Sequence, residues 1–297
     1  MDAARSIAEP QSARLLSSLV QLVKPAVTRM VMVTMLCGAL AAPAQIHWIE
    51  LFVALFGTAL VVGSANALNM YLERDLDGLM TRTRNRPLPA GRIAPDVALT
   101  FGIALGAIGL PVLFLFVSPL VALLNALALS VYVAVYTPLK RVTPWALHAG
   151  ALPGALPPLI GWATVADGIS LAALVPFAIL FVWQLPHFLA ISLFRREEYA
   201  RAGLRVLSVT HGAAATRRAI ALYAGLLLAV TLLPLVVDLG DWFYLALAVP
   251  PGLVFLVHAL RGLGKRADEQ WARRLFLLSL PHLVLVFAGL VVASQVG

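Results

Sequence analysis

The sequence predicts an all-helical, polytopic membrane protein with nine transmembrane helices in a single domain. Of its 297 residues, 61% are hydrophobic and only 12% are charged, with a mean hydropathy of +0.91. A soluble domain of this length could not cover so much apolar surface. Apolar runs of the roughly 20 residues needed to cross about 30 Å of hydrocarbon recur along the chain. All 22 Lys and Arg residues fall into five clusters, which alternate with loops that lack both residue types.

Nine apolar runs are the expected membrane spans, and each is bounded by polar residues, Pro or Gly. In order they cover residues 26–43, 48–69, 97–116, 119–136, 145–165, 171–194, 219–237, 242–258 and 275–293. The fourth run is the least clearly separated span, because only a few residues around Ser118 divide it from the third. The first follows a polar segment, residues 1–24, and residues 25–297 are expected to form the transmembrane domain.

The basic clusters predict the orientation of these spans. They run from Arg5 to Arg29, Arg74 to Arg92, Lys140 to Arg141, Arg195 to Arg218 and Arg261 to Arg274. By the positive-inside rule these clusters are cytoplasmic, so the N-terminus is expected inside and the C-terminus outside. The protein has a net charge of +8, and we expect its basic residues to interact with anionic headgroups of the lipid bilayer or with an anionic substrate. We expect no nucleic-acid partner.

A polar stripe marks the cytoplasmic end of the second run. Asn69, Glu73 and Asp77 are spaced i, i+4 and i+8, so they lie on one face of a helix, whereas Asp75 points to the opposite side. Two adjacent carboxylates repel each other unless a cation lies between them. One interpretation is a solvated helix end whose acids pair with Arg74, Arg82 or Arg84. The other is a Mg²⁺ site, since Mg²⁺ uses one or two carboxylates together with substrate phosphates.

The segment that follows the stripe favours the metal site. It carries Arg82, Arg84, Arg86 and Arg92 within eleven residues. Diphosphate bound to Mg²⁺ requires both a metal ion and guanidinium groups for its oxygens. The sequence therefore predicts a Mg²⁺-diphosphate site at the cytoplasmic ends of the helices.

These residues resemble a known family. Asn69 to Asp77, followed by Arg82-Thr-Arg-Asn-Arg-Pro-Leu, is similar to the first signature of the UbiA-type intramembrane prenyltransferases. The segments Tyr136-Thr-Pro-Leu-Lys-Arg and Trp183-Gln-Leu-Pro-His-Phe resemble the protoheme IX farnesyltransferase (heme O synthase) branch. That branch implies transfer of a farnesyl group from farnesyl diphosphate to a vinyl group of protoheme IX (heme b). It also implies a bacterial inner membrane, with heme A synthase or a terminal oxidase as assembly partners.

The resemblance also implies residue roles. Asn69, Glu73 and Asp77 would hold Mg²⁺, and Arg82, Arg86, Lys140 and Arg141 would bind the diphosphate. Lys140 has a second interpretation as a positively charged anchor at the membrane surface. Tyr136, one turn before Lys140, is either a contact to phosphate or to the allylic cation, or an interfacial tyrosine.

His187 lies inside the sixth run, where an ionisable residue is costly, and Trp183 precedes it by one helical turn. One hypothesis is that the pair contacts heme. The other is an imidazole packed in a helix kinked by Pro186. The loop Arg195 to Arg218 is expected to form a short helical cap over the site.

Two other functions compete with this prediction. A UbiA-type enzyme could instead prenylate an aromatic quinone precursor, but this chain has only Glu197 and Glu198 where such members carry a second Asp-rich motif. An ion-coupled transporter is disfavoured by the odd number of spans and by polar residues that gather at one membrane face.

Overall fold

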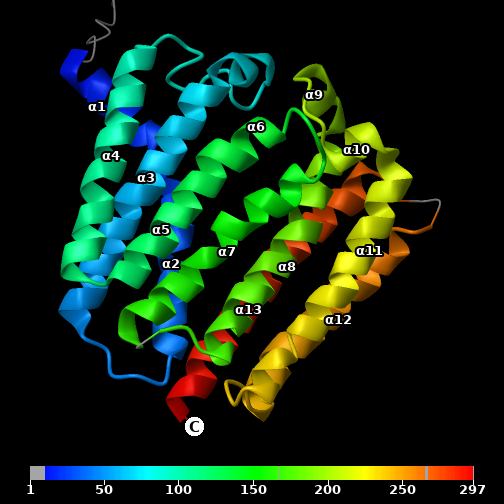
Figure 1. The fold of residues 1–297 in the computed structure, drawn as a ribbon. Coiled ribbons are helices and arrows are strands. Elements are labelled where there is room, and N and C mark those ends of the chain that lie inside the picture. Colours follow the sequence, from blue (N-terminus) through cyan, green and yellow to red (C-terminus); the bar gives the residue numbers. More distant parts are fainter. Residues whose placement is uncertain (1–10, 167, 265–266, 297) are drawn as a thin grey trace, which may run out of the picture.

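The structure, a computed structural model, describes residues 11–166, 168–264 and 267–296, and helices account for most of them (Figure 1). Three parts of the predicted topology lie outside the described residues. They are residues 1–10 of the cytoplasmic segment, Asp167 in a loop expected to be external, and Lys265 in the last basic cluster. The helices are α1 (Gln11–Leu22), α2 (Pro25–Ala41), α3 (Trp48–Leu79), α4 (Pro95–Phe116), α5 (Pro119–Ser130), η1 (Val131–Tyr136), α6 (Thr137–Leu139), α7 (Ala146–Val165), α8 (Leu171–Phe194), α9 (Arg196–Arg201), α10 (Leu207–Thr210), α11 (Gly212–Val230), η2 (Leu233–Val236), α12 (Trp242–Arg261) and α13 (Glu269–Val296).

The predicted count of nine spans is wrong, although every predicted apolar run falls on a helix. Within the described part of the chain, seven helices are long and apolar enough to cross a membrane, or eight if α1 and α2, bent by 43°, form one span. Helix α7 qualifies in neither count, and it contains Pro153, Pro157 and Pro158. It packs against α2, α5, η1 and α8, and many of its side chains are buried. A helix surrounded by protein does not need the hydropathy of a lipid-facing one.

Small residues allow α2 and α7 to approach closely. A Cβ atom on Gly161 of α7 would collide with the backbone oxygen of Met35, and one on Gly38 of α2 would collide with that of Pro158. Such contacts drive helix association in lipid, where apolar burial against solvent cannot. The pairing places the N-terminal end of α2 beside the polar ends of α3 and α6.

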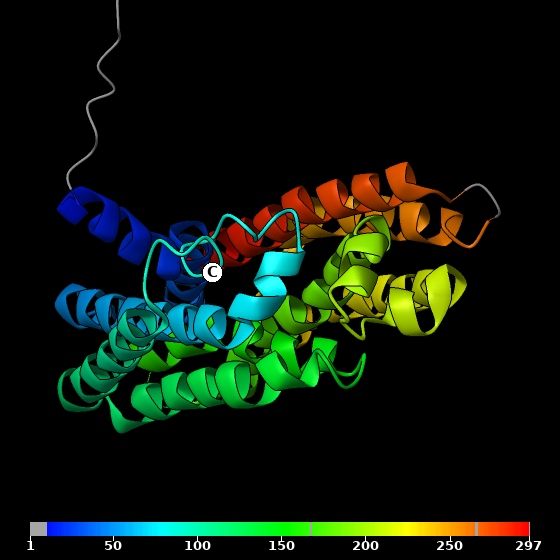
Figure 2. The ribbon, with the colours of Figure 1, turned by 90° about the horizontal axis from the view of Figure 1, so that it is seen from above.

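Two apolar clusters hold the bundle together away from its polar end. One joins α2, α3, α5, α7 and α8 around residues such as Met35, Leu159 and Ile179. The other joins α8, α11, α12 and α13 around Trp183 and Phe255. Seen from above, α3 and α4 lie at one end of the bundle and α11 and α12 at the other (Figure 2).

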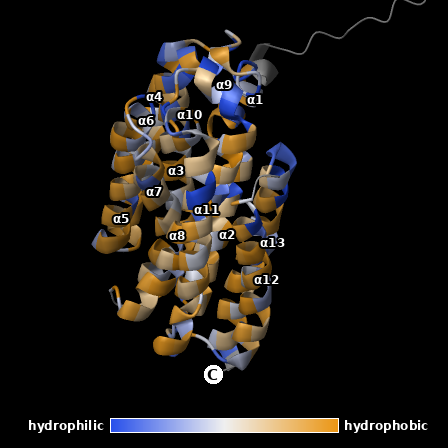
Figure 3. Ribbon diagram, turned by 90° about the vertical axis from the view of Figure 1, so that its right-hand side faces the viewer, coloured by the Kyte–Doolittle hydropathy of each residue, from blue (hydrophilic) through white to orange (hydrophobic). Residues whose placement is uncertain are grey.

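Hydrophilic residues gather mainly at the end of the bundle where α1, α9 and α10 lie (Figure 3). Helix α3 has 32 residues, which corresponds to about 48 Å at 1.5 Å per residue. This is longer than the roughly 30 Å of hydrocarbon that a span must cross. The last turns of α3, with the polar stripe, therefore reach the polar end of the bundle.

Candidate active site

The three residues of the polar stripe share one face of α3, as their spacing predicted, and the structure shows that this face is buried. Asn69, Glu73 and Asp77 are 2%, 8% and 1% exposed. The side chain of Asp75 is 86% exposed, which confirms that it lies on the other side of the helix. Burying two carboxylates costs several kcal/mol each unless they gain partners, so the partners decide what this site is.

Each buried carboxylate pairs with one cation. Lys140 forms an ion pair with Glu73, and Arg86 Nη1 lies 2.7 Å from Asp77 Oδ2. The solvated alternative named Arg74, Arg82 and Arg84 as partners, but none of these pairs with either acid in the structure; Arg74 lies 4.0 Å from the exposed Asp75. The cations that neutralise the stripe come from a loop and from the end of α6, so tertiary packing brings them together.

Asn69 links the stripe to two further elements. Its Nδ2 donates to Glu73 Oε2 at 2.9 Å and to Thr137 Oγ1 at 3.1 Å, and its Oδ1 accepts from Lys24 Nζ at 2.9 Å. Lys24 has a left-handed backbone, with φ 48°, at the junction between α1 and α2. The bend between those helices turns this lysine toward α3 and adds a third cation to the site.

The loop after α3 is folded around the last acid of the stripe. Thr83 Oγ1 donates to the backbone oxygen of Asp77 at 2.8 Å, and this bond helps to fix the turn from which Arg86 reaches the carboxylate. The backbone N–H of Arg82 donates to Glu198 Oε1 at 3.1 Å. The loop is thereby tied to the segment after α8.

Helix α5 continues through a π-helical segment, η1, into α6. Thr137 Oγ1 donates to the backbone oxygen of Tyr132 at 2.8 Å, within this wider turn. Tyr132 and Tyr136 have ring centroids 5.4 Å apart, and Lys140 Nζ lies 4.6 Å from the centroid of the Tyr136 ring. Wider helical turns of this kind occur often at functional sites. Here the three side chains form one wall beside the stripe.

The segment after α8 forms the predicted short helix, α9, at the polar end of the bundle (Figure 1). Ala202 and Leu204 pack against Met80, and the backbone N–H of Arg205 donates to the Lys140 carbonyl at 2.9 Å. Burial raises the pKa of Tyr199 above its usual value, so this phenol stays protonated and can donate. The segment therefore joins the two loops that supply Arg86 and Lys140.

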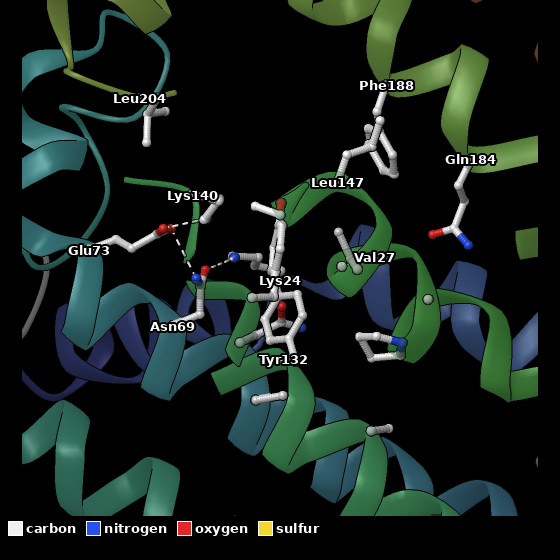
Figure 4. A pocket seen from close by; sticks show the side chains of 18 of the residues that line it. Lys24, Val27, Asn69, Glu73, Tyr132, Lys140, Leu147, Gln184, Phe188 and Leu204 are labelled. Carbon is white, nitrogen blue, oxygen red and sulfur yellow. Dashed lines mark hydrogen bonds and ion pairs between the residues drawn. The ribbon is translucent and has the colours of Figure 1, made fainter. Parts of the chain in front are cut away.

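A cavity of about 480 Å³ opens among these elements. Figure 4 shows Asn69, Glu73, Lys24 and Lys140 at one side and Val27, Leu147, Phe188 and Gln184 at the other. One side is therefore densely charged, whereas the residues labelled on the other are apolar apart from the amide of Gln184. A ligand with an anionic head and an apolar body matches this division.

Seven of the ten predicted site residues line this cavity. They are Asn69, Glu73, Asp77, Arg82, Arg86, Tyr136 and Lys140. Arg141 is exposed and is not among the lining residues.

Trp183 and His187 are also not among the lining residues. Trp183 Nε1 donates to the backbone oxygen of Ser279, 2.8 Å away on α13, and His187 Nδ1 lies 2.7 Å from Ser279 Oγ. Their rings stack with centroids 4.5 Å apart. This geometry favours the packing interpretation of the pair, and the heme contact stays a prediction.

The cavity wall also contains Lys24, Tyr199 and Gln184, which were not predicted from the sequence to belong to the site. Lys24 carries a weak signal, a lysine directly before the proline that begins an apolar run. Tyr199 belongs to the loop Arg195 to Arg218, which was expected to form a cap over the site. Gln184 lies between Trp183 and His187, the two residues predicted to contact heme, and no role was predicted for Gln184 itself.

The donor set of the stripe fits Mg²⁺. It consists only of oxygen ligands, two carboxylates and one amide, at the wall of a cavity. Among the described residues no group of three His, Cys, Asp or Glu side chains is placed to hold a metal ion. Mg²⁺ typically uses one or two carboxylates together with substrate phosphates, and this site offers two carboxylates beside a cavity.

Fold and site together define an intramembrane enzyme for substrates with an anionic head and an apolar tail. Residues 30–280 match the UbiA prenyltransferase family, and the chain belongs to it. It is 47% identical over 281 residues to a protoheme IX farnesyltransferase of Anaeromyxobacter dehalogenans (strain 2CP-C), covering 95% of each chain. It is 46% identical to that of Myxococcus xanthus (strain DK1622), covering 92% of this chain and 93% of the relative.

Solved structures share the fold at low sequence identity. A structure of digeranylgeranylglyceryl phosphate synthase superposes with a TM-score of 0.80 at 16% identity, covering 94% of this chain and 98% of the other. The structure of a UbiA homologue from Archaeoglobus fulgidus bound to GPP and Mg²⁺ superposes with a TM-score of 0.64 at 16% identity. The match covers 92% of this chain and 99% of the other. This chain is therefore an all-helical, polytopic membrane protein of the UbiA type.

Proposed function

We propose that this protein is a protoheme IX farnesyltransferase, which transfers the farnesyl group of farnesyl diphosphate to a vinyl group of protoheme IX and forms heme O. Relatives with that activity align with this chain at 47% and 46% identity over nearly its full length. The observation that carries the proposal locally is the division of the cavity. Its charged side suits the diphosphate and its apolar side suits the farnesyl chain and the heme.

Loss of the diphosphate requires that its developing negative charge be neutralised. Mg²⁺, held by Asn69, Glu73 and Asp77, would supply this as a Lewis acid on the phosphate oxygens. The carboxylates orient that ion, and they are already fixed by hydrogen bonds from Asn69 and Arg86. A fixed arrangement lowers the reorganisation needed when charge moves.

Five cationic residues line the cavity, namely Lys24, Arg82, Arg86, Lys140 and Arg205. Lys140 and Arg86 neutralise the acids here. With Mg²⁺ held by the acids, Lys140 and Arg86 would be free to bind the diphosphate oxygens. Arginine provides two parallel donors and lysine a point charge, so together they suit a diphosphate with oxygens of both phosphates exposed.

The farnesyl cation must meet the vinyl group before it meets water. Tyr132 and Tyr136 line the cavity, and aromatic rings attract a cation. The segment that contains α9 closes against Met80, next to the charged side. We infer that this segment excludes bulk water from the charged side once the substrates are bound.

Orientation in the membrane follows from the charge pattern, and we propose that the N-terminus and the charged side of the cavity face the cytoplasm. Reporters fused after Gly91, Lys140 and Arg205 should then be cytoplasmic, and those after Gln45 and Gly240 external. A periplasmic reporter signal at Gly91 would place the diphosphate site on the wrong side and contradict this orientation.

The decisive test of the reaction is chromatography of the hemes extracted from membranes with and without this protein. A new, more hydrophobic heme that depends on farnesyl diphosphate and on Mg²⁺ would support the proposal. A prenylated aromatic acid with unchanged hemes would support the quinone alternative, and ion flux into sealed vesicles would support a transporter. Assembly with heme A synthase or a terminal oxidase remains a prediction, which co-purification would test.

A further inference from the structure

The side-chain oxygen of Gln184, Oε1, is a hydrogen-bond acceptor at the wall of the cavity, on the side opposite the charged residues. The Gln184 side chain is 6% exposed, and its Nε2 donates to the backbone oxygens of Ala151 and Leu180, each 3.1 Å away. Both N–H bonds of the amide are thereby used, one to α7 and one within α8. The orientation of the amide is fixed, and Oε1 must be the free end.

The free oxygen faces the cavity and accepts no hydrogen bond from the described residues. It lies over Gly154, where a Cβ atom would collide with it, so the missing side chain of α7 leaves the space for this carbonyl. Gln184 and Gly154 both line the cavity, and Figure 4 shows Gln184 across it from Asn69, Glu73 and Lys140. A buried carbonyl without a donor is costly unless a ligand or water satisfies it.

We propose that Gln184 Oε1 holds the water molecule that completes the reaction, an inference that rests on the proposed function. In that reaction the C1–O bond of farnesyl diphosphate breaks, and its electron pair stays on the diphosphate. The vinyl π electrons then form a C–C bond from the terminal vinyl carbon to farnesyl C1, which leaves a cation at the inner vinyl carbon. A lone pair of water forms the C–O bond there, and the surplus proton passes to the diphosphate.

The position of this acceptor matches that step. A water molecule that donates one hydrogen bond to Oε1 keeps its lone pairs free for the cation. Three residues of the surrounding wall, Val27, Leu147 and Phe188, have apolar side chains that cannot accept a hydrogen bond from that water. Without a held water, the cation is expected to lose a proton from a neighbouring carbon and form an alkene lighter by one water. Gln184 would therefore select between hydroxylated and dehydrated products.

The test compares the products of purified wild-type protein, Gln184→Met and Gln184→Glu, separated by chromatography and weighed by mass spectrometry. Gln184→Met keeps the length of the side chain and removes the acceptor, so the ratio of hydroxylated to dehydrated farnesyl heme should fall about tenfold, the effect of one hydrogen bond. Gln184→Glu keeps an acceptor oxygen and should retain the hydroxylated product. Isotope-labelled water should label that product in the wild type.

Several outcomes would overturn the inference. An unchanged product ratio in folded Gln184→Met would do so, and so would an equal shift in Gln184→Met and Gln184→Glu, because the side chain would then act only as a tether between α7 and α8. If Gln184→Met does not fold, Gly154→Ala displaces Oε1 while leaving Gln184 intact; it should shift the ratio in the same direction, and an unchanged ratio there refutes the inference. A wild-type protein that makes no farnesyl heme refutes the proposed function instead.

Discussion

Two pairs of polar residues, each spaced by one helical turn, have opposite surroundings in this molecule. Glu73 and Asp77 on α3 face the cavity and pair with cations from the end of α6 and from the loop after α3. Trp183 and His187 on α8 face α13, where Ser279 satisfies both of them. The two pairs look similar in the sequence, because in each pair the side chains are spaced i and i+4 and lie near or inside an apolar run.

The comparison shows what such spacing can establish. Helical periodicity places side chains on one face, but it does not say whether that face meets a neighbouring helix or a cavity. On α8 the residue between the two predicted ones, Gln184, is the one that reaches the cavity. The following predictions test whether the difference between α3 and α8 is also a difference in function.

The largest effect is expected at the α3 pair. Glu73→Ala and Asp77→Ala should each lower turnover by on the order of 10² or more, because each removes a ligand worth several kcal/mol to the leaving group, at about 1.4 kcal/mol per tenfold. Turnover of the purified variants with farnesyl diphosphate, heme and Mg²⁺ measures this. Asp75→Asn is the control on the exposed face of the same helix, and an equal loss there would refute the assignment of faces.

A smaller effect is expected from the cations. Lys140→Met should weaken farnesyl diphosphate binding by about tenfold to a hundredfold, since charge-assisted hydrogen bonds contribute about 1.5 to 3 kcal/mol. Arg141→Met is the matched control, because Arg141 is the next residue but is exposed and outside the lining of the cavity. Equal weakening in both variants would indicate a general attraction of positive charge for the diphosphate and no specific contact.

The smallest effect on catalysis is expected at the α8 pair. His187→Ala should lower stability by about 1 to 3 kcal/mol, because it removes a buried hydrogen bond to Ser279. Farnesyl diphosphate affinity should stay nearly unchanged. Thermal unfolding in detergent and titration with the diphosphate measure the two quantities.

Ser279→Ala provides the comparison for this variant, since it removes the same bond while leaving the imidazole in place. If His187 contacts heme, His187→Ala should alter the heme absorption spectrum and Ser279→Ala should not. Equal and unaltered spectra in both variants would leave His187 with a packing role.

Much of the fold could be predicted from the sequence because the bilayer constrains it so strongly. Every expected apolar run is helical, since backbone polar groups in lipid must be satisfied within the segment. The short helix α9 was also predicted. The count of spans was wrong because α7 is shielded by α2, α5 and α8, and hydropathy along the chain does not reveal which helices lie inside the bundle.

For the site, the sequence by itself determined the face that Asn69, Glu73 and Asp77 share and the position of Asp75 on the opposite side, since both follow from 3.6 residues per turn. Only the tertiary structure decided that Lys140 and Arg86 neutralise the acids, that the bend at Lys24 turns a third cation toward Asn69, and that Gln184 meets the cavity while His187 meets α13. These contacts join residues up to 92 positions apart. Spacing along one helix carries no information about the rotation and approach of another, which depend on how side chains pack between them.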